Sequence, residues 1–177
     1  ISISKTNEEN LDIYPWHAKK DIFMPVASDC NDVSNYARNL SEEMKKRDVK
    51  LIDIATVPVT SYYFNEEVNK LGNKSVLLFN KCAKLILDIW NRFGEMSPSL
   101  FIDKHGGRNR YLPLLLPIFD NCFIRIHKEG NIESVYEVIG DNKNMMISFI
   151  QGSETKHFPI ALSSMCSKYI RELFIRL

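Results

Sequence analysis

One carboxylate, Asp103, stands between an apolar run at residues 99–102 and a glycine turn that basic side chains follow. A carboxylate at the end of a strand, beside such a turn and positive charges, is a common arrangement for handling a metal-bound phosphate. Taken alone, the segment is more simply explained as a strand, a turn and the solvated start of a helix. The residues after Asp103 are Lys104, His105, Gly106, Gly107, Arg108, Asn109, Arg110 and Tyr111.

A second group of polar residues lies near the C-terminus. Ser164, Lys168 and Arg171 are spaced i, i+4 and i+7, so a helix places them on one face, where they could seat a phosphate backbone. A solvated face explains the same spacing and is the simpler interpretation of this helix alone. Glu154 lies upstream, between a predicted strand and this helix, and suits either a metal ligand or a surface loop.

The elements that position these groups are predicted from hydrophobic periodicity and turn residues. Helices are expected over residues 29–47, 64–71, 75–93, 108–119 and 159–177. Strands are expected over residues 50–60, 99–103, 122–127, 134–139 and 145–150. Residues 1–28 show no such pattern and are expected to be irregular or extended. The order of elements predicts an α/β fold with one mixed sheet, in a single domain over residues 1–177.

Composition limits the classes of protein that fit. The 177 residues are 45% apolar and 25% charged, with a net charge of +1, so no overall field favours nucleic acid or membrane as a partner. Any such argument depends on local patches. The cysteines are too widely spaced for a structural zinc site, and we expect reduced thiols. They are Cys30, Cys82, Cys122 and Cys166.

No apolar run approaches the roughly 18 residues that span a membrane. The first residues also lack the apolar segment of a signal peptide. We therefore expect a cytoplasmic protein with no membrane partner. The chain begins with Ile1 and not with methionine, which favours a chain whose upstream part is missing.

Three segments together resemble the C-terminal half of ribonuclease HII. In that family a strand ends in Val-Asp-Gly, a Gly-Asp loop comes later, and the next helix reads Ala-Ala-Ser-Ile-x-Ala-Lys-x-x-Arg-Asp. The counterparts here are Ile102-Asp103, Gly152-Ser153-Glu154 and the helix at residues 161–172. The resemblance covers residues 64–177 loosely and is closest in the last helix. It implies a ribonuclease H-like mixed sheet flanked by helices.

The resemblance also implies a chemistry, the cleavage of phosphodiester bonds in RNA. In the family, four carboxylates bind two Mg²⁺ or Mn²⁺ ions, and the partner is an RNA–DNA hybrid or a ribonucleotide-containing duplex. Asp103 and Glu154 would be two of the four carboxylates, catalytic and metal-binding. The residues expected to contact nucleic acid are Lys104, Arg108, Arg110, Ser164, Lys168 and Arg171.

The chain departs from the family at its N-terminal strands. The family's Asp-Glu-Ala-Gly-Arg-Gly motif, which supplies the other two carboxylates, is absent. Two carboxylates cannot readily hold two metals in octahedral geometry. We therefore expect the sheet to be incomplete at its N-terminal strands, and this chain to have little or no nuclease activity. The acids before the first helix match no such strand; they are Asp12, Asp21, Asp29 and Asp32.

Two alternatives stay open beside the nuclease. The first is a non-catalytic module on the same fold that binds nucleic acid or another protein. The second is an unrelated enzyme with Asp103 and His105 as an acid–base pair, although no motif for a nucleophile, nucleotide or cofactor is present. The sequence does not fix the oligomeric state or the role of the aromatic segment Tyr14-Pro15-Trp16.

Overall fold

The computed structural model describes residues 29–176. The chain divides into two compact units, and each is treated by itself. One unit is Val59–Met165, and the other combines the residues up to Pro58 with those from Cys166 onward. The expectation of a single domain over residues 1–177 stays a prediction.

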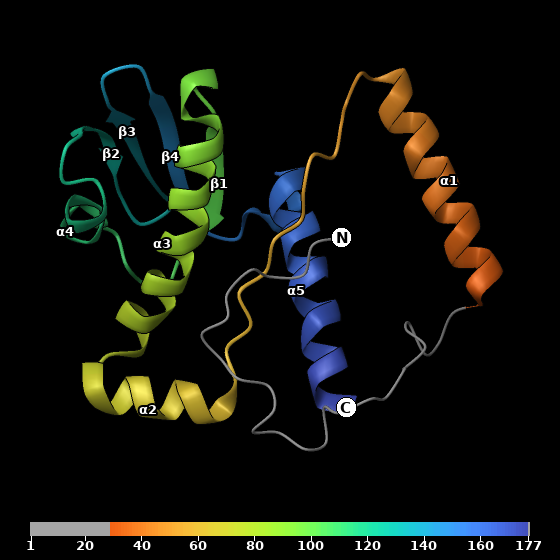
Figure 1. Ribbon diagram of the computed structural model, residues 1–177, viewed down its shortest axis with the longest axis horizontal. Coiled ribbons are helices and arrows are strands. Elements are labelled where there is room, and N and C mark those ends of the chain that lie inside the picture. The colour runs from red at the N-terminus through yellow and green to blue at the C-terminus, as the bar shows by residue number, and fades with distance from the viewer. Residues whose placement is uncertain (1–28, 177) are drawn as a thin grey trace. The chain divides into compact units, whose positions relative to one another are not determined.

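The unit Val59–Met165 is built on a four-stranded mixed sheet with the spatial order β1-β4-β3-β2 (Figure 1). β1 runs parallel to β4, and the other two neighbouring pairs are antiparallel. This confirms the predicted α/β class with one mixed sheet. The strands are β1 (Ser99–Asp103), β2 (Phe123–Glu129), β3 (Glu133–Ile139) and β4 (Asn144–Ile150).

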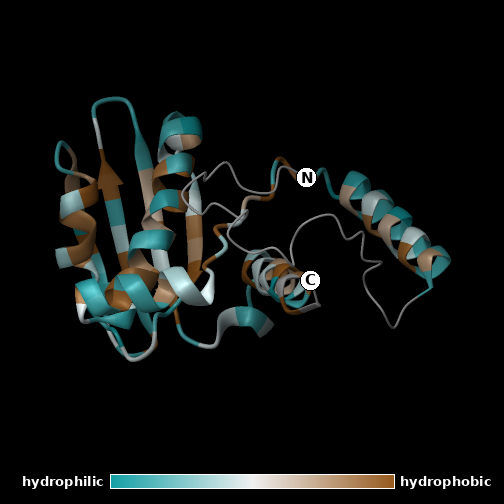
Figure 2. Cartoon of the chain, turned by 60° about the horizontal axis from the view of Figure 1, so that its bottom comes forward, coloured by the Kyte–Doolittle hydropathy of each residue, from teal (hydrophilic) through white to brown (hydrophobic). Residues whose placement is uncertain are grey.

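Helix α3 (Lys74–Phe93) packs along one face of this sheet and supplies four of the thirteen buried residues of the core. Its buried apolar side chains recur at the helical period. Burial alternates along β3 and in the first half of β4, and Figure 2 shows brown, apolar bands on the strands. The buried residues of this core are Phe79, Ala83, Ile86, Trp90, Leu100, Tyr111, Leu115, Phe119, Tyr136, Val138, Met145, Ile147 and Phe149.

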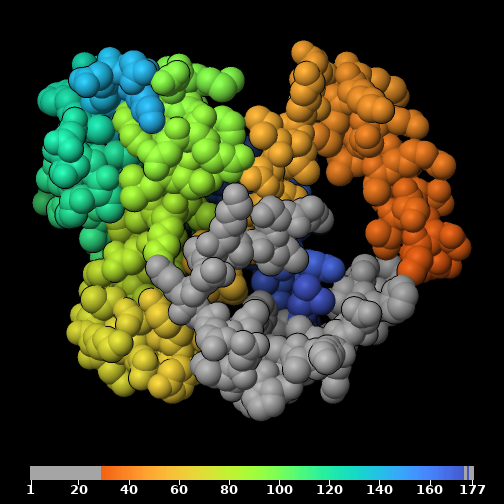
Figure 3. Space-filling model, viewed as in Figure 1, coloured from red at the N-terminus to blue at the C-terminus, as the bar shows by residue number. Residues whose placement is uncertain are grey.

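Helix α2 (Ser61–Leu71) precedes α3 and packs against it, so that the two present one continuous surface (Figure 3). The turn between them is fixed by Gly72 at φ 64°, a conformation that suits a glycine after a helix end. Asn73 then begins α3, because its side-chain oxygen accepts from the amides of Ser75 and Val76. The predicted helices at 64–71 and 75–93 are confirmed, with α2 three residues longer at its start.

The predicted helix at residues 108–119 is largely wrong. The structure has a single turn, α4 (Leu112–Leu115), continued by the 3-10 helix Leu116–Ile118. Pro117 cannot donate the amide hydrogen bond that would extend α4, and this limits the helix. Residues 104–111 are held as a loop by hydrogen bonds to distant groups, which periodicity does not reveal.

Outside this unit, α1 (Cys30–Lys46) begins where Asp29 caps it by accepting from the amide of Asn31, as predicted. The predicted strand at residues 50–60 is wrong, since these residues form neither helix nor strand. Within residues 29–176 no strand pairs with their β-forming side chains, and Leu51 and Ile52 are exposed. The last helix, α5, runs over Phe158–Arg176 and confirms the predicted one up to the end of the described residues.

Among the helices of residues 29–176, none is long and apolar enough to cross a membrane. All four cysteines fall in this range and are free thiols. Burial raises the pKa of the Cys82 thiol to about 12, as expected for a cysteine that acts as a small hydrophobic residue in α3.

Candidate phosphate-binding pocket

The loop after β1, residues 104–111, is fixed at both ends by backbone hydrogen bonds. At its start, the Lys104 amide donates to the Ile150 carbonyl at 3.2 Å and continues the pairing of β1 with β4. The His105 amide donates to the Tyr111 hydroxyl at 2.9 Å, which closes the loop on itself. At its end, the Tyr111 amide donates to the buried Tyr136 hydroxyl at 2.8 Å. The loop is therefore attached to three strands of the sheet.

The aromatic rings beneath the loop give it a rigid floor. Tyr111 and Phe149 are both fully buried, and their rings stack with centroids 3.6 Å apart. Tyr136 meets Phe149 edge-on at 6.3 Å. Aromatic pairs of this kind stabilise a core beyond the area that they bury. The Tyr136 hydroxyl also donates to a Glu129 carboxylate oxygen at 2.5 Å, and burial first and this bond second raise the Tyr136 pKa above its usual range.

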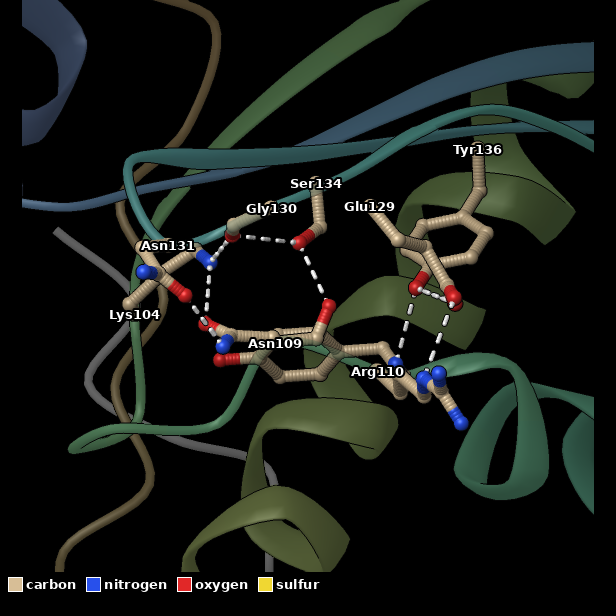
Figure 4. A network of polar contacts seen from close by, with 9 residues as sticks. Lys104, Asn109, Arg110, Glu129, Gly130, Asn131, Ser134 and Tyr136 are labelled. Atoms are coloured by element: carbon tan, nitrogen blue, oxygen red, sulfur yellow. Dashed lines mark hydrogen bonds and ion pairs between the residues drawn. The ribbon is translucent and has the colours of Figure 1, made fainter.

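Lys104 points inward from the loop and is only 8% exposed. Its ammonium group donates to the carbonyl oxygen of Gly130 and to the side-chain oxygen of Asn109, the latter at 3.2 Å (Figure 4). Burial lowers the pKa of this amine. Lys104 thus joins the loop to the turn between β2 and β3. Its expected contact with nucleic acid stays a prediction.

Asn109 is held by two further partners, on the same turn and on β3 (Figure 4). The buried Ser134 hydroxyl donates to the Asn109 carbonyl at 2.6 Å. The Asn109 amide nitrogen donates to the side-chain oxygen of Asn131 at 2.6 Å. Arg110, the next residue, lies 3.8 Å from Glu129 and is mostly exposed, so this ion pair is weak.

The tip of the loop lines an open pocket of about 620 Å³. Gly106 adopts φ 62°, the left-handed region that disfavours other residues. No atom lies within 4 Å of where a β-carbon of Gly106 or Gly107 would stand, so both backbones face open space. The lining residues are Ser75, His105, Gly106, Gly107, Arg108, Asn109 and Arg110.

Arg108 and Ser75 meet at this pocket although they are 33 residues apart in sequence. The Arg108 guanidinium donates to the Ser75 hydroxyl oxygen through Nε at 3.3 Å and through Nη2 at 3.1 Å. Ser75 is in the first turn of α3, so the pocket adjoins the positive end of a 20-residue helix. Because the Ser75 oxygen accepts from Arg108, its own proton is available to another acceptor. Arginine, a hydroxyl and a helix N-terminus are groups that bind phosphate.

His105 lines the same pocket as a neutral ring. Its imidazole packs edge-on against Phe79, Tyr111 and Phe149, and its Nδ1 is buried without a hydrogen-bond partner among residues 29–176. Burial lowers the His105 pKa, the Arg108 charge lowers it further, and Asp103 opposes them. The unpartnered Nδ1 favours the tautomer that carries its proton on Nε2.

This pKa shift predicts a pH dependence of stability. The pKa of His105 in the folded chain lies below its value in the unfolded chain. Above about pH 6.5 the ring is neutral in both states, so its protonation does not lower the free energy of unfolding. As the pH falls below that value, His105 becomes protonated in the unfolded chain before it does in the folded chain, and this favours unfolding. The free energy of unfolding should therefore fall more steeply between about pH 7.5 and about pH 5.5 in wild type than in His105→Phe. Urea unfolding at both pH values checks this, and equal changes in the two proteins would contradict it.

The two predicted metal-binding carboxylates lie at one edge of the sheet. Asp103 is the exposed last residue of β1, opposite Ile150, which ends the parallel strand β4. Glu154 follows in the 3-10 helix Ser153–Thr155, and its carboxylate accepts from the Ser164 hydroxyl at 2.9 Å. Within residues 29–176, no three His, Cys, Asp or Glu side chains gather closely enough to hold a metal. Asp103 and Glu154 alone therefore do not fit a two-metal site, and Asp12 and Asp21 lie outside the described residues.

The predicted contacts on the last helix are divided between the two units. Ser164 belongs to the unit that carries the pocket, whereas Lys168 and Arg171 belong to the other one. The Arg171 guanidinium pairs with Glu172 at 3.2 Å. These three residues stay predictions as nucleic-acid contacts. The Tyr14-Pro15-Trp16 segment lies outside the described residues.

The residues that hold the loop from a distance are not apparent from the sequence pattern. Ser75, Asn131, Ser134 and Tyr136 lie 20 or more residues from the loop positions that they contact. Only Ser75 gave a signal, since it follows the helix-capping Asn73. The others are brought to the loop by strand pairing, which no local pattern reports.

Comparison of the chain with protein-family models, with curated proteins and with solved structures finds no match. The function is therefore argued from the geometry of the pocket and from the sequence resemblance alone.

Proposed function

We propose that this protein binds the phosphate backbone of a nucleic acid at the pocket formed by Ser75 and residues 105–110. The observation that carries the proposal is the meeting of Arg108 with Ser75 at the N-terminus of α3, beside a glycine turn. A phosphate oxygen accepts hydrogen bonds only, and each of these groups donates.

The charges around the pocket favour an anion. Arg108 and Arg110 both line it, and α3 adds the partial positive charge of its N-terminus. Asn73 already satisfies the amides of Ser75 and Val76, so the donors that remain are side chains and loop amides. The chain's net charge is only +1, which makes this a local patch and not a basic surface. A few phosphate contacts, with modest affinity and strong salt dependence, are expected.

An extended polymer suits this pocket better than a small enclosed phosphate ligand. The pocket is open, and both glycines at the loop tip face open space. A backbone can pass along such a surface with one phosphate seated at Arg108. The resemblance of residues 64–177 to ribonuclease HII makes an RNA–DNA hybrid, or a duplex containing ribonucleotides, the first partner to test.

Binding of a 20-base-pair labelled RNA–DNA hybrid, followed by fluorescence anisotropy at several salt concentrations, tests the proposal. We expect a dissociation constant in the range of roughly 10⁻⁴ to 10⁻⁶ M near physiological salt, weakening as salt rises. Inositol hexaphosphate, a compact polyphosphate, is the control ligand. Binding of that ligand without binding of the hybrid would contradict the polymer as the partner.

A specific observation favours a second candidate, metal-dependent cleavage on a ribonuclease H-like fold. Asp103 and Glu154 follow the carboxyl ends of two neighbouring parallel strands, in the order along the chain that the family resemblance predicts. Asp103 is also close enough to His105 to affect its pKa, so it lies near the proposed phosphate. A carboxylate beside a phosphate is unfavourable unless a cation lies between them. Further carboxylates would have to come from outside residues 29–176.

We predict that Asp103→Asn abolishes any such cleavage. The codons preceding that of Ile1 are read first, and an in-frame strand ending in Asp-Glu-Ala-Gly would favour the nuclease. In the protein that includes those residues, Mg²⁺- or Mn²⁺-dependent cleavage of the hybrid should fall about 100-fold or more on Asp103→Asn, since a metal ligand is lost. Asp120→Asn, at an exposed carboxylate in the turn before β2, is the matched control. Equal activity in wild type and Asp103→Asn would remove this residue from the proposed site.

A further inference from the structure

The base of the pocket loop is attached to the turn between β2 and β3 by two buried polar side chains. Lys104 donates from the loop to the Gly130 carbonyl and to Asn109. Ser134 donates from the first part of β3 to the Asn109 carbonyl. Both side chains are buried, whereas Gly106 and Gly107 at the loop tip are exposed. The loop is thus fixed at its base, as Figure 4 shows, and its tip is exposed.

We propose that Lys104 is a positioning residue, which fastens the loop to the β2–β3 turn and so directs Arg108 into the pocket without contacting phosphate itself. The identity of the ligand rests on the proposed function. The attachment of the loop to the β2–β3 turn by Lys104 does not. The proposal gives Lys104 a role different from the phosphate contact that the sequence pattern predicts.

Burial and direction support this assignment. Lys104 is 8% exposed, and it is absent from the pocket lining although the six residues after it all contribute. With only 8% of the whole residue exposed, Lys104 offers a phosphate in solvent little surface to contact. Both of its hydrogen-bond partners lie on the protein, one of them 26 residues away in the β2–β3 turn.

The surroundings of the Lys104 ammonium group agree with a structural contact. Its two hydrogen-bond partners among residues 29–176 are neutral oxygens, of Gly130 and Asn109. Burying an ammonium group without an opposite charge is unfavourable, and burial accordingly lowers the Lys104 pKa. A fold retains such a group where the hydrogen bonds define one arrangement of the chain. Here that arrangement is the path of the loop.

Asn109 connects the Lys104 contact to the position of Arg108. Its side-chain oxygen accepts from Lys104, its side-chain nitrogen donates to Asn131, and its carbonyl accepts from Ser134. Three contacts on one residue leave its backbone little freedom. Arg108 is the preceding residue, so the direction of its side chain toward Ser75 depends on the position of Asn109.

The test combines amide hydrogen exchange with salt-dependent binding of the labelled RNA–DNA hybrid. Lys104→Met keeps an unbranched side chain that is one atom shorter and removes the hydrogen-bond donors. Ser134→Ala removes the second contact without touching Lys104. In both variants the amides of His105 and Tyr111, which the loop structure protects, should exchange about tenfold faster. Hybrid affinity should fall about tenfold, with the salt slope unchanged. Lys128→Met, at a largely exposed lysine of β2, is the control and should change neither.

The outcomes separate the two proposals. Unchanged exchange at His105 and Tyr111 in both variants would overturn the fastening role, whatever the binding shows. A salt slope that falls by about 0.9 in Lys104→Met would make Lys104 a direct phosphate contact and would also overturn it. If Lys104→Met does not fold, the result for Ser134→Ala decides whether the loop is fastened to the β2–β3 turn. Faster amide exchange in Ser134→Ala supports this attachment, and unchanged exchange refutes it. If wild type binds no hybrid, the proposed function fails, and the exchange rates alone decide on Lys104.

Discussion

Replacing Phe149 with alanine should lower the free energy of unfolding of the Val59–Met165 unit by about 3–5 kcal/mol. Phe149 is fully buried in β4, and its ring stacks on Tyr111 at 3.6 Å. Its removal leaves a cavity beneath the pocket loop and deprives Tyr111, Tyr136 and His105 of a ring contact. The loss is a large part of the roughly 5–15 kcal/mol that stabilises a typical domain.

Urea unfolding followed by circular dichroism checks this prediction. The matched control is Phe123→Ala, since Phe123 lies on edge strand β2 and is 62% exposed. Its removal should change the free energy of unfolding by no more than about 0.5 kcal/mol. Equal losses in the two variants would mean that the stacked rings are not the centre of the core.

Replacing Arg108 with glutamine should weaken binding of the RNA–DNA hybrid about 10- to 100-fold. The change removes a charged donor from the pocket and leaves a shorter, neutral polar side chain. A hydrogen bond to a charged group contributes about 1.5–3 kcal/mol, and each 1.4 kcal/mol is about tenfold in affinity. The slope of log affinity against log salt should also fall by about 0.9, the value for one phosphate contact. Anisotropy titrations at four salt concentrations measure both quantities.

Arg125→Gln is the control for this experiment. Arg125 is another arginine of the same unit; it is exposed and pairs with Glu137 at 2.7 Å on strands β2 and β3. Its replacement changes the net charge by the same amount and leaves the pocket intact. Equal weakening by Arg108→Gln and Arg125→Gln would show that total charge, and not the pocket, determines binding.

The sequence predicts those parts of the fold that local patterns determine. The 3.6-residue period of α3 and the three C-terminal strands with the turns between them depend on neighbours in sequence, and both predictions are confirmed. Residues 50–60 are rich in β-forming side chains, but a strand requires a partner strand, which the local sequence does not contain. Proline at position 117 and the attached loop shorten α4 for reasons that periodicity also does not include.

The sequence predicts only those residues of the candidate site that are close together in the chain. The glycine turn and Arg108 are visible as a motif, and Asp103 is found at a strand end as expected. Ser75 joins them from 33 residues away through the packing of α3 on the sheet. In the sequence, Lys104 is not distinguished from the other basic residues of the loop. Its inward position is seen only in the structure, where its ammonium group donates to the carbonyl oxygen of Gly130, 26 residues away.

The most direct test of the central claim is an amide NMR titration of the ¹⁵N-labelled chain with the unlabelled RNA–DNA hybrid. The chemical shifts of Gly106, Gly107, Arg108 and Ser75 should change most and should saturate together, because these residues line the pocket. The chemical shifts of the β2 amides around Arg125 should not change. Saturable shifts confined to any other part of the chain, with the loop amides unmoved, would contradict a phosphate-binding pocket at this loop.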